Sequence, residues 1–122
     1  MPLSGKTILV VEDHFLVAED MRQCIVEAGG TAEHVVASEK EALDIVNHDE
    51  IDGALLDVDL RDHVKPVELA RQLAARSIPF IVVTGYERRW LPRELQKAPY
   101  IRKPYTHEEL TDLASRHFQG RR

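Results

Sequence analysis

A short apolar segment that ends in an acid constrains the fold of this chain more than any other feature. Residues 51–57 read Ile-Asp-Gly-Ala-Leu-Leu-Asp. An apolar run this short, with no helical face, is typical of a strand buried on both sides in a parallel sheet. Ligands of such sheets bind beyond the carboxyl ends of the strands, where Asp57 lies. Asp57 is therefore a candidate site residue, although an aspartate that merely ends a strand in a turn fits the same pattern.

Strands and helices alternate along the rest of the chain. Apolar or β-branched runs predict four more strands, at residues 7–11, 31–37, 78–83 and 99–102. The run at 31–37 is the most polar and predicts an edge strand. Helical spacing, with capping boxes that begin at Ser38 and Thr106, predicts helices at residues 14–29, 38–46, 66–74, within 87–98 and at 106–118. The segment 87–98 has the poorest helical pattern, and its start is not defined.

This alternation predicts an α/β fold with a doubly wound parallel sheet. Right-handed crossovers between parallel strands place helices on both faces of the sheet. The order 2-1-3-4-5 brings the first and third strands side by side at a switch point, so Glu12, Asp13 and Asp57 converge on one crevice.

Composition excludes several classes of protein. The chain has 122 residues, enough for one domain, with a formal charge of −5 and no Lys/Arg-rich run, so we expect no direct DNA binding. No apolar run approaches the ~20 residues of a membrane span, so we expect no membrane contact. Cys24 is the single cysteine, which agrees with a cytoplasmic location. The six histidines lack metal-ligand spacing, which argues against a zinc site.

The carboxylates at the predicted crevice indicate a divalent cation. Two like charges ~4 Å apart repel by roughly 4 kcal/mol at an effective dielectric constant of 20. A cation removes this penalty, and an open site with oxygen ligands suits Mg²⁺, which keeps several waters and accepts a phosphate oxygen. The neighbouring acids Glu12 and Asp13 suit the metal, which leaves the central Asp57 as the nucleophile.

Groups after the other strands suit a phosphoryl group. Lys103 supplies a positive charge, the Thr84 hydroxyl is a hydrogen-bond donor, and Gly85 exposes its backbone N–H and leaves the approach open. Together with an acid and Mg²⁺, these groups can stabilise a phosphoryl group in transfer.

The combined motif resembles the receiver domains of bacterial two-component response regulators. The matching residues are Glu12-Asp13, Asp57, Thr84 and Lys103-Pro104, in that order and spacing. The resemblance spans residues 7 to about 118 and implies a (βα)5 flavodoxin-like fold, with residues 1–122 forming one receiver domain without an output domain. It also implies a phosphoacceptor signalling domain rather than an enzyme. Asp57 would take the phosphoryl group from the histidine of a sensor kinase or phosphotransfer protein.

The resemblance also implies a role for each site residue. Mg²⁺ would be bound by Glu12, Asp13, Asp57 and the backbone carbonyl of Asp59. Thr84 and Lys103 would contact the phosphoryl oxygens, and the bond before Pro104 would be cis, an isomer that is essentially confined to proline.

A narrower resemblance concerns the fourth predicted strand. Residues 79–86, Pro-Phe-Ile-Val-Val-Thr-Gly-Tyr, are similar to the PFxFATGY stretch of stand-alone receivers found chiefly in alphaproteobacteria, although Val82 and Val83 depart from it.

The receiver resemblance also implies that Thr84 and Tyr100 form the switch that signals phosphorylation to a downstream protein partner. Tyr86 is a second candidate for the aromatic switch residue, and simple packing is the alternative for both tyrosines.

Two other interpretations remain open, one from the Asp57-Val58-Asp59 motif and one from the strand topology. The DxD pattern also fits phosphatases of the haloacid-dehalogenase type, which would use Asp57 and Asp59. That motif continues to Thr or Val where this chain has Arg61, and it follows the first strand rather than the third. A flavin-binding module shares the topology but needs a phosphate loop where Glu12-Asp13 would repel phosphate. Within a receiver, two effects of the Asp59 carboxylate compete: repulsion would lower the phosphorylated yield, and orientation of an attacking water would shorten the life of the acyl phosphate. We expect the second effect to dominate.

Overall fold

The chain folds around one parallel β-sheet. The computed structural model describes residues 1–61 and 65–119. Within these residues, five strands pair in the order β2-β1-β3-β4-β5, which confirms the predicted topology. The strands are β1 (Ile8–Val11), β2 (Val35–Val36), β3 (Gly53–Asp57), β4 (Phe80–Thr84) and β5 (Tyr100–Arg102). All pairings are parallel, so the carboxyl ends of the strands share one edge.

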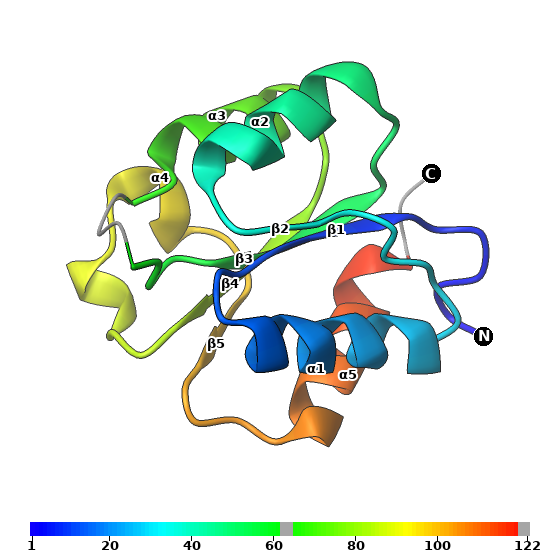
Figure 1. The fold of residues 1–122 in the computed structure, drawn as a ribbon. Coiled ribbons are helices and arrows are strands. Elements are labelled where there is room, and N and C mark those ends of the chain that lie inside the picture. Colours follow the sequence, from blue (N-terminus) through cyan, green and yellow to red (C-terminus); the bar gives the residue numbers. More distant parts are fainter. Residues whose placement is uncertain (62–64, 120–122) are drawn as a thin grey trace.

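Helices cover both faces of the sheet. Figure 1 shows α1 and α5 on one face and α2 and α3 on the other, with α4 beside α3. The helices are α1 (Phe15–Glu27), α2 (Glu39–His48), α3 (Val67–Ala75), the 3-10 turn η1 (Arg88–Trp90), α4 (Arg93–Gln96) and α5 (His107–Phe118). None of the helices in the described part of the chain is both long and apolar enough to span a membrane.

Two hydrophobic cores explain why the central strands carry apolar residues at every position. Leu9 and Leu56 point toward α2, α3 and α4, whereas Val10 and Leu55 point toward α1 and α5. Successive side chains of a strand point to opposite faces, so a strand covered on both sides has no position for an exposed polar residue. Every residue of β1 and β3 is buried, including Asp57.

The structure departs from the sequence prediction mainly at the sheet edge and before β5. The predicted strand 31–37 shortens to Val35–Val36, joined by an isolated bridge between Thr7 and Thr31. An edge strand has only one neighbour to hold it, and Val35 remains 40% exposed. Residues 87–98 form two short pieces, η1 and α4, on either side of Leu91-Pro92. Residues 62–64 of the predicted polar loop lie outside the described residues.

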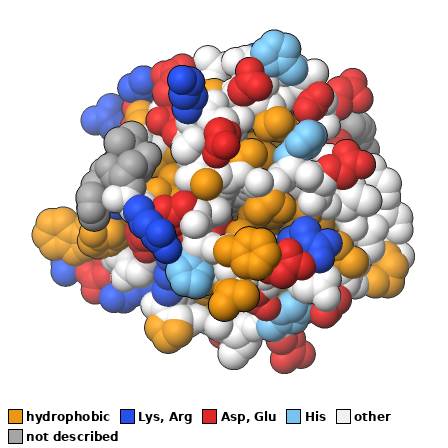
Figure 2. Space-filling model, viewed as in Figure 1, with side chains coloured by type: hydrophobic (Ala, Val, Ile, Leu, Met, Phe, Trp, Pro, Cys, Tyr) orange, Lys and Arg blue, Asp and Glu red, His pale blue; other side chains and the backbone are white. Residues whose placement is uncertain are grey.

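The described surface is mixed in charge. On the face seen in Figure 2, acidic side chains are spread widely and interspersed with Lys and Arg. This distribution agrees with the formal charge of −5.

Candidate functional site

The sheet topology brings the predicted residues to one edge. Residue Val11 of β1 lies beside Leu56 of β3, so Glu12 and Asp57 follow at the same level. Asp57 in turn pairs with Val83, one residue before Thr84. Thr84 pairs with Arg102, one residue before Lys103, whose backbone N–H donates to the Thr84 carbonyl at 2.8 Å. Four neighbouring strands thus deliver acids, a hydroxyl and an ammonium group to one crevice.

Asp57 lies at the centre of this crevice. It is 1% exposed, and Oδ2 accepts a hydrogen bond from Lys103 Nζ at 2.8 Å. Its other oxygen, Oδ1, accepts from the Asp59 backbone N–H at 2.6 Å. Burial lowers the pKa of Lys103, but the hydrogen bond and the charge of Asp57 outweigh burial and leave that pKa raised. Lys103 is therefore a firmly charged partner of the acceptor carboxylate.

Glu12 is a buried acid whose two oxygens differ in environment. Oε2 accepts from the His14 backbone N–H at 2.9 Å. Oε1 is buried and has no hydrogen-bond partner among the described residues. Burial, reinforced by the nearby Asp57 carboxylate, raises the pKa of Glu12 to about 8. An unpaired buried carboxylate oxygen is costly, and a cation or its bound water would satisfy it, so this site fits a divalent metal.

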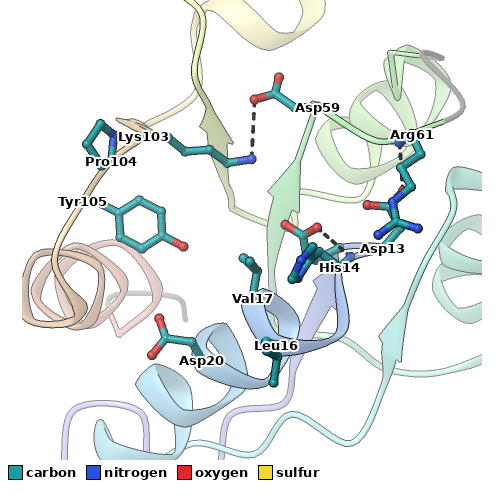
Figure 3. A pocket seen from close by; sticks show the side chains of 11 residues that line it. Asp13, His14, Leu16, Val17, Asp20, Asp59, Arg61, Lys103, Pro104 and Tyr105 are labelled. Atoms are coloured by element: carbon teal, nitrogen blue, oxygen red, sulfur yellow. Dashed lines mark hydrogen bonds and ion pairs between the residues drawn. The ribbon is translucent and has the colours of Figure 1, made fainter.

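The acids open onto a cavity of about 590 Å³ at the start of α1. In Figure 3, Asp59 and Lys103 lie on one side of this space, and Leu16, Val17 and Asp20 of α1 lie on the other. Asp13 Oδ2 accepts from the Arg61 backbone N–H at 2.8 Å, which ties the β1 end to the loop after β3. The cavity is large enough to admit a metal ion with its waters and the side chain of a partner.

The groups expected to bind a phosphoryl group surround the carboxylate of Asp59. The Thr84 hydroxyl donates to Oδ1 at 2.8 Å, and the Gly85 backbone N–H donates to Oδ2 at 2.7 Å. Lys103 Nζ lies 3.5 Å from Oδ2, and Lys65 Nζ lies 4.0 Å from Oδ1. The sequence indicated the three donors but not their common partner, and nothing in the pattern singled out Lys65.

The two candidate switch tyrosines contact one another. The Tyr100 hydroxyl donates to the Tyr86 backbone carbonyl at 2.9 Å, and the Arg88 guanidinium lies 4.5 Å from the centre of the Tyr100 ring. Tyr86 is 51% exposed, with Lys65 Nζ 4.5 Å from its ring centre. The Lys103–Pro104 peptide bond is cis, the geometry that the resemblance implied.

The fold and the acid-lined crevice define a doubly wound α/β domain with its site at the β1/β3 switch point. The model of the response regulator receiver domain family matches residues 8–115, and the chain therefore belongs to that family. It is a receiver domain of the kind that serves two-component systems. A comparison with curated proteins finds no significant match.

Solved structures agree with this assignment. The solution structure of SdrG from Sphingomonas melonis Fr1 is 33% identical, over 94% of this chain and 97% of SdrG, with a TM-score of 0.77. A CheY-like receiver from Methanospirillum hungatei JF-1 is 26% identical over 88% of each chain, with a TM-score of 0.73. The receiver domain of the sensor histidine kinase PA1611 from Pseudomonas aeruginosa PAO1 shares the fold at 22% identity, over 97% of this chain and all of that domain, with a TM-score of 0.79.

Proposed function

We propose that Asp57 accepts a phosphoryl group from a histidine of a sensor kinase or phosphotransfer protein. The observation that carries this proposal is the environment of Asp57, a carboxylate that is 1% exposed at the carboxyl edge of the sheet and is paired with Lys103 at 2.8 Å. In the transfer, a carboxylate oxygen of Asp57 attacks phosphorus and forms a P–O bond. The P–N bond breaks, and the electron pair stays on the histidine nitrogen.

The other residues of the crevice would bind either the metal ion or the oxygens of the transferred phosphoryl group. Glu12, Asp13, Asp57 and the backbone carbonyl of Asp59 would hold Mg²⁺, which neutralises charge on the phosphoryl oxygens when bound. Lys103, the Thr84 hydroxyl and the Gly85 N–H would donate to those oxygens. The unpaired Oε1 of Glu12 supports a metal at this place, and the PA1611 receiver was solved with a magnesium ion in its active-site cleft.

Phosphorylation would then act through the segment after β4. Thr84 ends β4, and the backbone of the next residues carries the Tyr86 carbonyl that holds the Tyr100 hydroxyl. Movement of Thr84 toward a phosphoryl oxygen would strain this contact, and the changed surface would recruit a downstream protein. Residues 79–86 favour the stand-alone PFxFATGY subgroup of receivers for this chain.

An exposed apolar pair beside the crevice suits the phosphodonor protein. Phe15 and Leu16 begin α1 and are 77% and 70% exposed. Leu16 also lines the site cavity, so a partner that covers this pair would place its histidine beside Asp57.

One assay tests Asp57 as the acceptor and distinguishes a receiver from the phosphatase alternative. The full chain is incubated with acetyl phosphate and Mg²⁺, and its intact mass is measured. We expect wild type and the exposed-surface control Asp112→Asn to gain one labile phosphoryl group, and Asp57→Asn to gain none. Undiminished Mg²⁺-dependent labelling of Asp57→Asn would refute the assignment. Catalytic release of phosphate without a labelled protein would instead support the phosphatase alternative that uses Asp57 and Asp59.

A further inference from the structure

The Asp59 side chain lies where a phosphoryl group would find its donors. Its carboxylate is bound by the Thr84 hydroxyl at 2.8 Å and by the Gly85 N–H at 2.7 Å. Lys103 Nζ lies 3.5 Å from Asp59 Oδ2, and Figure 3 marks this ion pair with a dashed line. These are the three groups to which the proposed function assigns the phosphoryl oxygens. They are thus engaged by an anion of the chain itself.

Carboxylate and phosphoryl oxygens compete for donors of this kind. Both are anionic acceptors that shorten and strengthen hydrogen bonds from hydroxyl, amide and ammonium groups. A phosphoryl group on Asp57 carries roughly two negative charges. Keeping the Asp59 carboxylate in place would set its negative charge against that of the phosphoryl group at short range. The two anions cannot hold the same donors together.

We propose that the Asp59 carboxylate is an internal competing anion, which occupies the phosphoryl-binding donors until a phosphoryl group displaces it. This inference rests on the proposed function of Asp57. It predicts that Asp59 lowers both the phosphorylated yield and the affinity for a phosphoryl mimic. It also predicts that Asp59 holds Thr84 and Gly85 toward the crevice before phosphorylation.

Lys65 provides a partner for the displaced carboxylate. Its Nζ lies 4.0 Å from Asp59 Oδ1, on the side of the loop that leads to α3. The ammonium group is held by the Val58 carbonyl at 3.1 Å and lies 4.5 Å from the centre of the Tyr86 ring. A second cavity, lined in part by Asp59, Lys65, Gly85 and Tyr86, gives the carboxylate room to turn. Arrival of Asp59 at Lys65 would disturb the contact of Lys65 with Tyr86.

A purely structural role for Asp59 makes a different prediction. If the carboxylate only fastened the turn after β4, its removal would loosen Thr84 and Gly85 and weaken the binding of a phosphoryl mimic. If it competes, its removal frees the Thr84 hydroxyl and the Gly85 N–H, leaves Lys103 paired with Asp57 alone, and strengthens that binding. The sign of the change therefore separates the two roles.

The experiment measures the affinity of the full chain for beryllofluoride, a phosphoryl mimic, in the presence of Mg²⁺. We expect Asp59→Asn to bind it about tenfold more tightly than wild type at low ionic strength, and the gain to shrink as salt screens the charges. Asp112→Asn is the matched control and should bind like wild type. Equal or weaker binding by Asp59→Asn would overturn the inference. If wild type binds neither beryllofluoride nor a phosphoryl group, the proposed function fails instead.

Two further measurements test the contact of Asp59 with Gly85 and the role of Lys65. Without Mg²⁺ or mimic, the Gly85 amide of Asp59→Ala should lose its carboxylate partner and exchange its hydrogen faster than in wild type. Lys65→Gln should weaken mimic binding in wild type, because the displaced carboxylate loses its partner, but not in Asp59→Asn. Equal weakening in both backgrounds would mean that Lys65 contacts the mimic directly, and unchanged Gly85 exchange would mean that Asp59 does not hold the loop.

Discussion

Replacement of Gly53 by alanine tests the packing of β3 against α5. Gly53 begins β3 and pairs with Ile8 of β1. An added Cβ would lie 2.7 Å from Cδ1 and 2.8 Å from Cε1 of Phe118, and 3.1 Å from Cδ1 of Ile8. Phe118 and Ile8 are both fully buried, so neither side chain can turn toward solvent to make room. Space, rather than backbone conformation, is what requires glycine here.

The expected loss of stability follows from two opposing effects. Overpacking of a filled core costs about 1–3 kcal/mol, whereas replacing glycine restricts the unfolded chain and returns about 0.4–1 kcal/mol. We therefore expect Gly53→Ala to lower the free energy of unfolding by roughly 1–2 kcal/mol. Equilibrium urea unfolding measures this value, and an unchanged m-value would show that the surface exposed on unfolding is the same in the two proteins.

A double-mutant cycle locates the strain at the ring of Phe118. Phe118→Leu alone should destabilise the fold by removing buried apolar area, yet it should relieve part of the cost of Gly53→Ala when the two are combined. Gly85→Ala is the control, because its Cβ would approach only Asp59 Oδ2, at 3.7 Å. A Gly53→Ala protein as stable as wild type would refute the packing argument, and additive effects would place the strain elsewhere.

Two other predictions concern ions and protons. Mg²⁺ should raise the melting temperature because it binds the native state alone. Asp13→Ala should reduce this rise, whereas Glu33→Ala, a change on the exposed surface, should not. Equal losses in the two variants would mean that the acids do not form a metal site. Asp20 and Glu27 hydrogen-bond to His107 at 2.9 and 2.8 Å and raise its pKa. These pairs therefore stabilise the fold fully below the ordinary imidazole pKa, and their contribution is lost as pH rises through the raised pKa. His107 is 37% exposed, so the free energy of unfolding in urea should differ between wild type and His107→Gln by less than about 1 kcal/mol. This difference should vanish at high pH, and a difference that grows with pH would contradict the prediction.

The fold and the positions of the main site residues could be predicted because both depend on strand patterns. Buried parallel strands leave continuous apolar runs, and the residue after each run must lie at the carboxyl edge of the sheet. Asp57, Thr84 and Lys103 were placed by this rule alone. The cis bond before Pro104 came from the family resemblance, since no local pattern specifies it.

Contacts between loops could not be predicted in the same way. The sequence predicts that the Asp59 side chain lies near the path of an attacking water, but it does not indicate the hydrogen bonds from Thr84 and Gly85, which lie at the end of another strand. Lys65 stood in a polar loop without periodicity. The role of Asp59 in water orientation stays a prediction, and its carboxylate is engaged by these donors in the structure.

The two cores need different lengths of the chain before they can be complete. The core on the α2, α3 and α4 face draws its buried residues from Leu9 to Leu95, whereas the core on the α1 and α5 face runs from Leu3 to Phe118. A domain generally folds as one unit during synthesis, so neither core is complete before its last residue is available. Helix α1 can cover β1 early, whereas the part of the same face that α5 covers, beside β4, stays uncovered until α5 has been synthesised. A nascent chain that stops within α5 would expose the apolar face of the sheet that α5 normally covers. Exposed apolar surface of this kind aggregates, so this form of the chain would be the one most dependent on a chaperone.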